Sequence, residues 1–109
     1  MKKGMLLRIY LTESDQVDDS PAMDAILALC KEAGLKGVTV TRGIEGLGEH
    51  GVHSTSFLSL ASDLPLIVEA IDTPAIIEAA TELIRPHLGH RTLATWPVSV
   101  MRTDEGSNP

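Results

Sequence analysis

Apolar and polar positions follow two different periods along this chain, and these periods divide it into six elements. Alternating apolar positions predict strands in residues 5–12 and 37–42, and two further apolar stretches, residues 64–72 and 91–101, are also predicted as strands. Apolar residues spaced three and four apart predict one helix after Ser20-Pro21 and another after Thr73-Pro74, pairs that are typical of a helix cap followed by proline. Gly34 is expected to end the first helix. The alternation after residue 54 is too weak to assign an element.

The order strand-helix-strand, loop, strand-helix-strand gives two split βαβ units in a chain with no room for more. This order predicts the α+β class and a ferredoxin-like βαββαβ sandwich, in which one antiparallel sheet carries two helices on one face. The other face of the sheet then has no helix over it. A bare apolar face is normally buried by another subunit, so we expect an oligomer.

The composition narrows the range of functions. A chain of 109 residues fits a single domain, which we place at residues 1–102, with the polar residues 103–109 as a flexible tail. The net charge is −6 and no basic run follows Lys2-Lys3, which argues against a nucleic-acid partner. The sequence contains no run of about 18 apolar residues, so we expect no direct membrane insertion. The single cysteine, Cys30, excludes an internal disulfide, favours a cytoplasmic location and is expected to be a small buried apolar group.

The segment TRGIEGLGEHGVH, residues 41–53, is rich in glycine and lies between two predicted strands. Residues 46–51 match the G-x-G-x-x-G pattern of dinucleotide-binding folds, but that pattern needs a helix behind it, and no helical period follows here. Dinucleotide-fold binding is therefore rejected. Two hypotheses stay open: a turn at 46–48 whose N–H groups form an anion-binding nest with Arg42 or Arg91, and a plain mobile connection.

The titratable residues support weaker hypotheses. The four histidines include two pairs at a spacing of three residues but fall in different elements, so surface or hydrogen-bonded histidines are favoured over a metal site. These histidines are His50, His53, His87 and His90. The acidic loop that contains Glu13, Asp15, Asp18 and Asp19 would suit a cation, although such a loop is more often simply solvated. No catalytic arrangement can be placed, so we expect neither enzymatic activity nor a bound metal.

Three segments resemble a known family. "LRIYLTESD", "AGLKGVTVTRGIEGLGEHGVH" and "LSLASDLPLIVEAIDTP" are similar to the DUF190 family of small PII-like proteins, within the nitrogen-regulatory PII superfamily. The resemblance runs from about residue 6 to residue 100, and its most specific parts are residues 39–46 and 62–65. It agrees with the βαββαβ order, which was reached from periodicity alone.

The resemblance implies a PII-like homotrimer that binds small effectors, such as adenine nucleotides, in clefts between subunits. In PII proteins the segment that runs into the loop after the second strand reads G-x-T-V-T, a few residues, and then G-F-G, and residues 37–41 and 46–48 resemble it with one extra residue between them. The resemblance implies that Thr39, Gly46, Leu47 and Gly48 would touch the nucleotide. Arg42 and Arg91 from the nest hypothesis, together with Arg102, complete the expected ligand-binding set. The 43–56 loop would change conformation and dock on a partner, and its docking residues would be Glu45, Glu49, His50 and His53.

The chain also departs from PII proteins. Their glycine-rich loop after the second helix carries a phosphate-binding lysine, whereas this chain has Leu88-Gly89-His90-Arg91, so Arg91 would replace the lysine and Arg102 would act as a C-terminal cation. The 43–56 loop has no tyrosine, which excludes the uridylylation of some PII proteins.

The main hypothesis is therefore a cytoplasmic PII-like signalling protein that requires no cofactor and responds to an adenine nucleotide. DUF190 members often accompany fluoride-channel genes, so the resemblance suggests a membrane transporter or channel as the regulated partner. The alternative is a CutA-like metal-tolerance trimer that uses His50, His53 or His90. A small ferredoxin-like enzyme is disfavoured.

Overall fold

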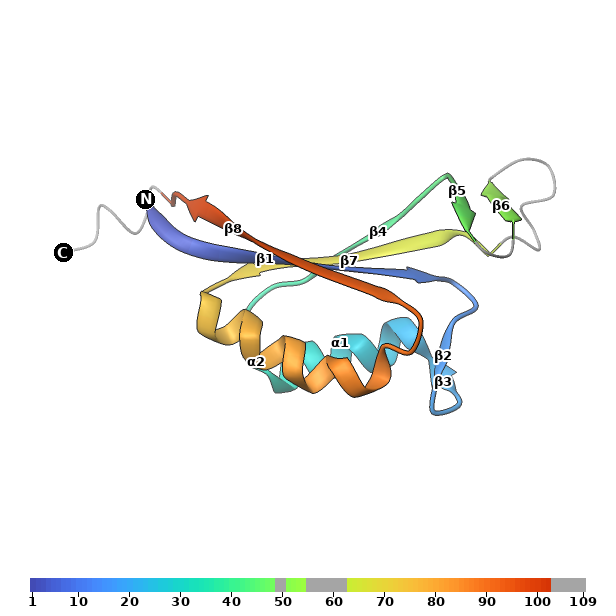
Figure 1. Ribbon diagram of the computed structural model, residues 1–109, viewed down its shortest axis with the longest axis horizontal. Helices are drawn as coiled ribbons and strands as arrows, with labels where there is room; N and C mark the ends of the chain where they lie inside the picture. Colours follow the sequence, from blue (N-terminus) through green and yellow to red (C-terminus); the bar gives the residue numbers. More distant parts are fainter. Residues whose placement is uncertain (49–50, 55–62, 103–109) are drawn as a thin grey trace.

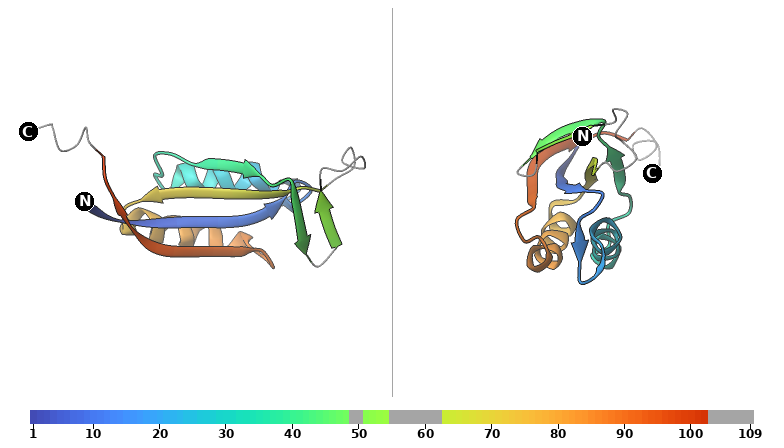
Figure 2. Two further views of the ribbon diagram at one scale, coloured as in Figure 1. Left: turned by 90° about the horizontal axis from the view of Figure 1, so that it is seen from above. Right: turned by 90° about the vertical axis from the view of Figure 1, so that its right-hand side faces the viewer.

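A four-stranded antiparallel sheet with both long helices on one face forms the body of the molecule. The computed structural model describes residues 1–48, 51–54 and 63–102. The strands lie in the order β4-β7-β1-β8, and α1 and α2 cover the same face (Figures 1 and 2). These elements are β1 (Lys2–Thr12), α1 (Ala22–Glu32), β4 (Thr39–Arg42), β7 (Pro65–Asp72), α2 (Pro74–Ile84) and β8 (Thr92–Val100), with one turn of 3₁₀ helix, η2 (Arg85–His87), after α2. The ferredoxin-like α+β prediction is confirmed.

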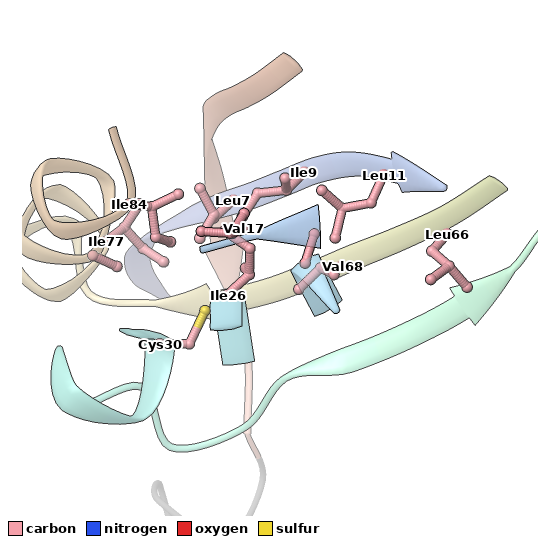
Figure 3. Packing of buried hydrophobic residues seen from close by; sticks show 12 residues of the cluster. Leu7, Ile9, Leu11, Val17, Ile26, Cys30, Leu66, Val68, Ile77 and Ile84 are labelled. Atoms are coloured by element: carbon pink, nitrogen blue, oxygen red, sulfur yellow. The ribbon is translucent and has the colours of Figure 1, made fainter. Parts of the chain in front are cut away.

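The core is aliphatic and lies between the sheet and the two helices. Alternate residues of β1 and β7 point toward the helices and meet apolar residues of α1 and α2 (Figure 3). The labelled side chains are Leu7, Ile9, Leu11, Val17, Ile26, Cys30, Leu66, Val68, Ile77 and Ile84. Burial raises the pKa of the Cys30 thiol, which therefore behaves as the small apolar group that was expected.

The helix ends differ in how well the sequence predicted them. Thr73 caps α2 as predicted, because its Oγ1 accepts a hydrogen bond from the N–H of Ile76 at 3.2 Å. Gly34 follows α1 with φ +93°, a backbone conformation that residues with a side chain rarely adopt. The start of α1 was predicted one residue too early: Pro21 is its N-cap, and no side chain caps the helix. Within the described ranges, neither α1 nor α2, at 11 residues each, is long enough to cross a bilayer.

Two small hairpins were not predicted. The first consists of β2 (Gln16–Val17) and β3 (Ser20–Pro21), joined by two residues with positive φ, Asp18 and Asp19. The second consists of β5 (Glu45–Gly48) and β6 (Gly51–Ser54) and runs across the end of the sheet (Figure 2). The described part of the 43–56 loop is therefore a paired hairpin and not a plain connection.

The face of the main sheet opposite the helices is here called the open face. Register and alternation assign it Leu6, Arg8 and Tyr10 of β1, Ile67, Glu69 and Ile71 of β7, Ala94, Trp96 and Val98 of β8, and Thr39 and Thr41 of β4. Three of its large side chains are more than a third exposed: Tyr10, Ile71 and Trp96. This is the bare apolar face that the sequence predicted.

Candidate functional site

The β5–β6 hairpin is fixed to the sheet at what we call the hairpin root, formed by Glu13, Arg42, Gly43, Asp63 and Pro65. The N–H of Gly43 donates to the carbonyl of Pro65 at 2.8 Å as the chain leaves β4. A Cβ at Gly43 would lie only 2.6 Å from Pro65 Cγ. Only glycine, which has no side chain, therefore fits this close to Pro65. The two most specific parts of the family resemblance therefore meet here, at Gly43 of the first part and at Asp63 and Pro65, which belong to the described residues of the second.

Two acidic side chains, one after β1 and one before β7, complete the hairpin root. Glu13 Oε2 lies 3.0 Å from Arg42 Nη2, and Asp63 Oδ1 accepts a hydrogen bond from the N–H of Ser14 at 2.7 Å. The Arg42 side chain is 64% exposed, so this ion pair contributes at most about 1 kcal/mol and costs little to break. Arg42 is thus available to an anion. The Asp63 carboxylate and the N–H of Glu13, which donates to the Leu64 carbonyl at 3.0 Å, join the chain after β1 to the segment before β7. The sequence reading gave Asp63 no role, although it lies inside the family-specific segment.

Arg91 is held by contacts within the chain. Its Nη2 donates to the Gln16 carbonyl at 2.9 Å and its Nη1 donates to the Leu88 carbonyl at 3.1 Å. Its Nε lies 3.3 Å from Asp15 Oδ2, which is close enough for charge attraction, but the pair is not aligned as a hydrogen bond. Only 11% of the side chain is exposed. Arg91 therefore ties the segment after η2 to the β2–β3 hairpin, at the same end of the sheet as the hairpin root.

The structure corrects the nest hypothesis for residues 46–48. These residues belong to β5, where Gly46 pairs with His53 and Leu47 pairs with Val52. A nest requires a turn, whereas a paired strand has an extended backbone. The described backbone is therefore extended, and ligand binding by these residues stays a prediction. Of the predicted docking residues, Glu49 and His50 lie outside the described residues. Glu45 is the first residue of β5, and His53 lies within β6.

The remaining predicted ligand residues do not all lie at this end of the chain. Thr39 lies on the open face, opposite Glu69 in the register. Arg102 follows β8, whose nine residues run away from Arg91 over roughly 26 Å at ~3.3 Å per residue. Arg102 and the hairpin root are thus at opposite ends of one sheet (Figure 1). Arg102 would reach a hairpin root only if that root belonged to a second copy of the chain.

The histidines do not form a metal cluster in the part of the chain that the structure describes. His87 Nδ1 lies 3.8 Å from Asp18 Oδ2, and His90 is exposed in the turn before β8. No group of three or more His, Cys, Asp or Glu side chains within these residues is arranged to hold a metal ion. In the acidic loop, Glu13 and Asp15 face Arg42 and Arg91.

An ion pair stands at the centre of the open face. Arg8 donates to Glu69 Oε1 through Nε at 2.9 Å and through Nη2 at 2.6 Å. The guanidinium also lies 5.1 Å from the centroid of the Trp96 ring, and hydrogen bonds with Tyr10 and Glu69 raise the pKa of Arg8. The two charges at the centre of this mostly apolar face are thus matched within one chain, which suits a face that packs against another copy.

The sheet order and the two helices on one face define a PII-like, ferredoxin-like fold. The chain is similar to CPII, a nitrogen regulatory PII-like protein from Thiomonas intermedia K12 solved with ADP, AMP and bicarbonate, with a TM-score of 0.72 and 18% identity over 95% of this chain and 93% of that chain. It is also similar to the divalent ion tolerance protein CutA1 from Ehrlichia chaffeensis, with a TM-score of 0.61 and 14% identity over 96% of this chain and 90% of that chain. At such identities these similarities establish the fold alone, and both classes of protein share it.

The family follows from the sequence comparisons. The model of DUF190, described as "Uncharacterized ACR", matches residues 4–100. A UPF0166 protein of Aquifex aeolicus (strain VF5) is 37% identical over 93 residues, which cover 84% of this chain and 89% of that protein. This chain belongs to the DUF190 family, so the resemblance found in the sequence is confirmed.

Proposed function

We propose that this protein is a cytoplasmic PII-like regulator: a homotrimer that binds an adenine nucleotide between subunits and signals through the 43–56 loop. The observation that carries the proposal is the hairpin root, where Gly43 and Pro65 join a projecting hairpin to the sheet. A hairpin that is fixed at its base and projects from the end of the sheet suits a segment that changes conformation when a ligand binds beside it. The structure of CPII with ADP and AMP supports an adenine nucleotide as the effector class.

The trimer would bring together ligand residues that one chain keeps apart. The open face is apolar and bare, so packing it against two other copies removes Tyr10, Ile71 and Trp96 from water. One subunit would supply Thr39, Arg42, Gly46, Leu47, Gly48 and Arg91, and the neighbouring subunit would supply Arg102. In this arrangement the length of β8, roughly 26 Å, that separates Arg91 from Arg102 within one chain is no obstacle.

Signalling would follow from a population shift. Nucleotide contacts at the base of β5 favour one conformation of the 43–56 loop, and a partner then binds that conformation. The docking residues in this proposal are Glu45, Glu49, His50 and His53. The partner is a membrane transporter or channel, the protein itself is not an enzyme, and no cofactor is required.

Isothermal titration calorimetry with AMP, ADP, ATP and cyclic AMP tests this proposal. We expect saturable binding of at least one nucleotide to the trimer, weakened about tenfold by Arg42→Gln because a charge-assisted contact to phosphate is lost. Arg85→Gln is the matched control, since Arg85 also forms an exposed ion pair, with Glu82, but lies on the helix side. Absence of heat with all four nucleotides, in a sample shown to be trimeric, would overturn the nucleotide proposal.

The second candidate is the CutA-like metal-tolerance trimer, which the similarity to CutA1 keeps open because the fold is shared. Copper and zinc titrations of His50→Ala, His53→Ala and His90→Ala variants separate it from the first. Metal binding that weakens in these variants would favour it. Metal affinity that is unchanged in all three would end it.

A further inference from the structure

A surface pocket of about 140 Å³ lies at the end of the sheet opposite the hairpin root. The start of β1, the end of β7, the residues after β8 and the connection between α1 and β4 all contribute to its wall. The polar residues that line it are Lys2, Lys3, Lys36, Asp72, Thr73 and Arg102. Segments that are far apart in the sequence therefore bring four cations to one depression.

This concentration of positive charge is local. The chain has nine basic residues and a net charge of −6, yet four of the nine line this one pocket. Elsewhere, Arg8, Arg42, Arg85 and Arg91 each lie beside a carboxylate. By contrast, three of the pocket cations, Lys3, Lys36 and Arg102, form no ion pair with any residue in the described ranges. Their charge is therefore not neutralised within the described part of the chain.

The carboxylate in the pocket is engaged by the backbone. Asp72 Oδ1 accepts a hydrogen bond from the N–H of Thr73 at 2.8 Å, and its Oδ2 accepts one from the N–H of Lys36 at 3.4 Å. These bonds hold the connection before β4 against the start of α2, which places the Lys36 side chain at the pocket. Asp72 thus builds the wall of the pocket, and it leaves an excess of positive charge there.

We infer that this pocket binds a phosphate group. Three cations without an ion pair in the described ranges, against one carboxylate, suit an anion with two or more negative charges, whereas a single carboxylate ligand would need only one cation. The planar guanidinium of Arg102 suits two phosphate oxygens at once, and the lysines supply point charges around them. Pockets for whole drug-sized ligands are roughly 300–1,000 Å³, so 140 Å³ matches a phosphate or diphosphate, either free or at the end of a nucleotide.

The test uses the full chain with both lysines changed, Lys3→Gln/Lys36→Gln, and a charge-matched control, Lys31→Gln/Arg85→Gln, whose residues do not line the pocket. Inorganic diphosphate and ADP are titrated separately at constant ionic strength, by calorimetry and by the NMR shifts of the Lys36 and Thr73 amides. We expect at least one of the two to bind the unchanged protein and shift these amides. Its affinity should fall about tenfold or more in the pocket variant and less than about twofold in the control.

The two titrations distinguish the sources of the phosphate. Diphosphate binding that depends on the lysines supports a free oxyanion, and lysine-dependent binding of ADP alone supports the end of a nucleotide. Equal losses in the pocket variant and the control, or no shift of the two amides with either ligand, would overturn the inference. Lys3 and Lys36 are not in the proposed nucleotide set at the hairpin root, so this result stands whether or not Arg42→Gln weakens nucleotide binding.

Discussion

The Arg91 side chain lies at the end of the sheet where the hairpin root is found, and it is held by contacts with other parts of the same chain. Its guanidinium bonds the carbonyls of Gln16 and Leu88 and lies beside Asp15, so it connects the segment after η2 with the β2–β3 hairpin. The sequence identified Arg91 as a candidate phosphate ligand because it stands where PII proteins have a lysine. Sequence position alone does not show that its donors already have acceptors within the chain.

Arg91→Ala should lower the free energy of unfolding by about 1–2 kcal/mol, because the Gln16 and Leu88 carbonyls lose a charged donor and Asp15 loses its counter-charge. Arg85→Ala, which removes an exposed pair with Glu82, should lower it by less than about 0.5 kcal/mol. Urea denaturation of the two variants measures the difference. Equal losses would contradict the structural role of Arg91.

At the scale of elements, periodicity predicted the main sheet and both helices but neither hairpin. Strands that alternate over eight or more residues, such as β1 and β7, carry a signal that short segments lack. β2 and β3 have two residues each, and β5 contains two glycines, which have no side chain to show alternation. The Asp18-Asp19 turn also lacks the Asn-Gly or Asp-Gly pair that usually marks such a hairpin.

The sequence likewise predicted only part of the candidate site. The family resemblance selected the segments that meet at the hairpin root, and Arg42 and Gly43 lie there. It did not show that Arg102 lies at the other end of the sheet, because that separation appears only when the strands are paired in register. The phosphate pocket was missed because Lys36, Asp72 and Arg102 are widely separated in the sequence.

The hairpin root can be tested with a matched pair of glycines. Gly43→Ala should lower the free energy of unfolding by about 1–3 kcal/mol, because the new Cβ would lie 2.6 Å from Pro65 Cγ and the backbone must shift. Gly37→Ala is the control, since a Cβ there meets nothing within 4 Å. Chemical denaturation that finds no difference between the two variants would contradict the close contact at the root.

In the β2–β3 turn, by contrast, a substitution is expected to raise the free energy of unfolding. Asp19 has φ +65°, which glycine adopts without strain, so Asp19→Gly should stabilise the fold by about 0.5–1 kcal/mol. Asp24→Gly, in the exposed face of α1, should instead destabilise it by about 1 kcal/mol. Thermal unfolding of both variants measures the two shifts, and a destabilised Asp19→Gly variant would count against the positive-φ turn.

At the scale of the whole molecule, the proposal requires the open face to be an interface. The double change Ile71→Asp/Trp96→Glu should convert a trimer to a folded monomer, because it puts charge on two apolar side chains that subunit contact would bury. Ile44→Asp is the control, an exposed apolar residue outside the open face. Sedimentation equilibrium measures the mass, and circular dichroism shows whether the variant is folded. A monomeric unchanged protein, or a double variant that stays trimeric, would contradict the assembly.

The central claim is that nucleotide binding changes the 43–56 loop, and hydrogen exchange of the protein with and without saturating ADP tests it most directly. The account predicts slower exchange with ADP at the amides of β5 and β6, relative to a core strand such as β1, because the ligand favours one conformation of the hairpin. Identical exchange across the 43–56 loop, measured at an ADP concentration shown by calorimetry to saturate the protein, would contradict it.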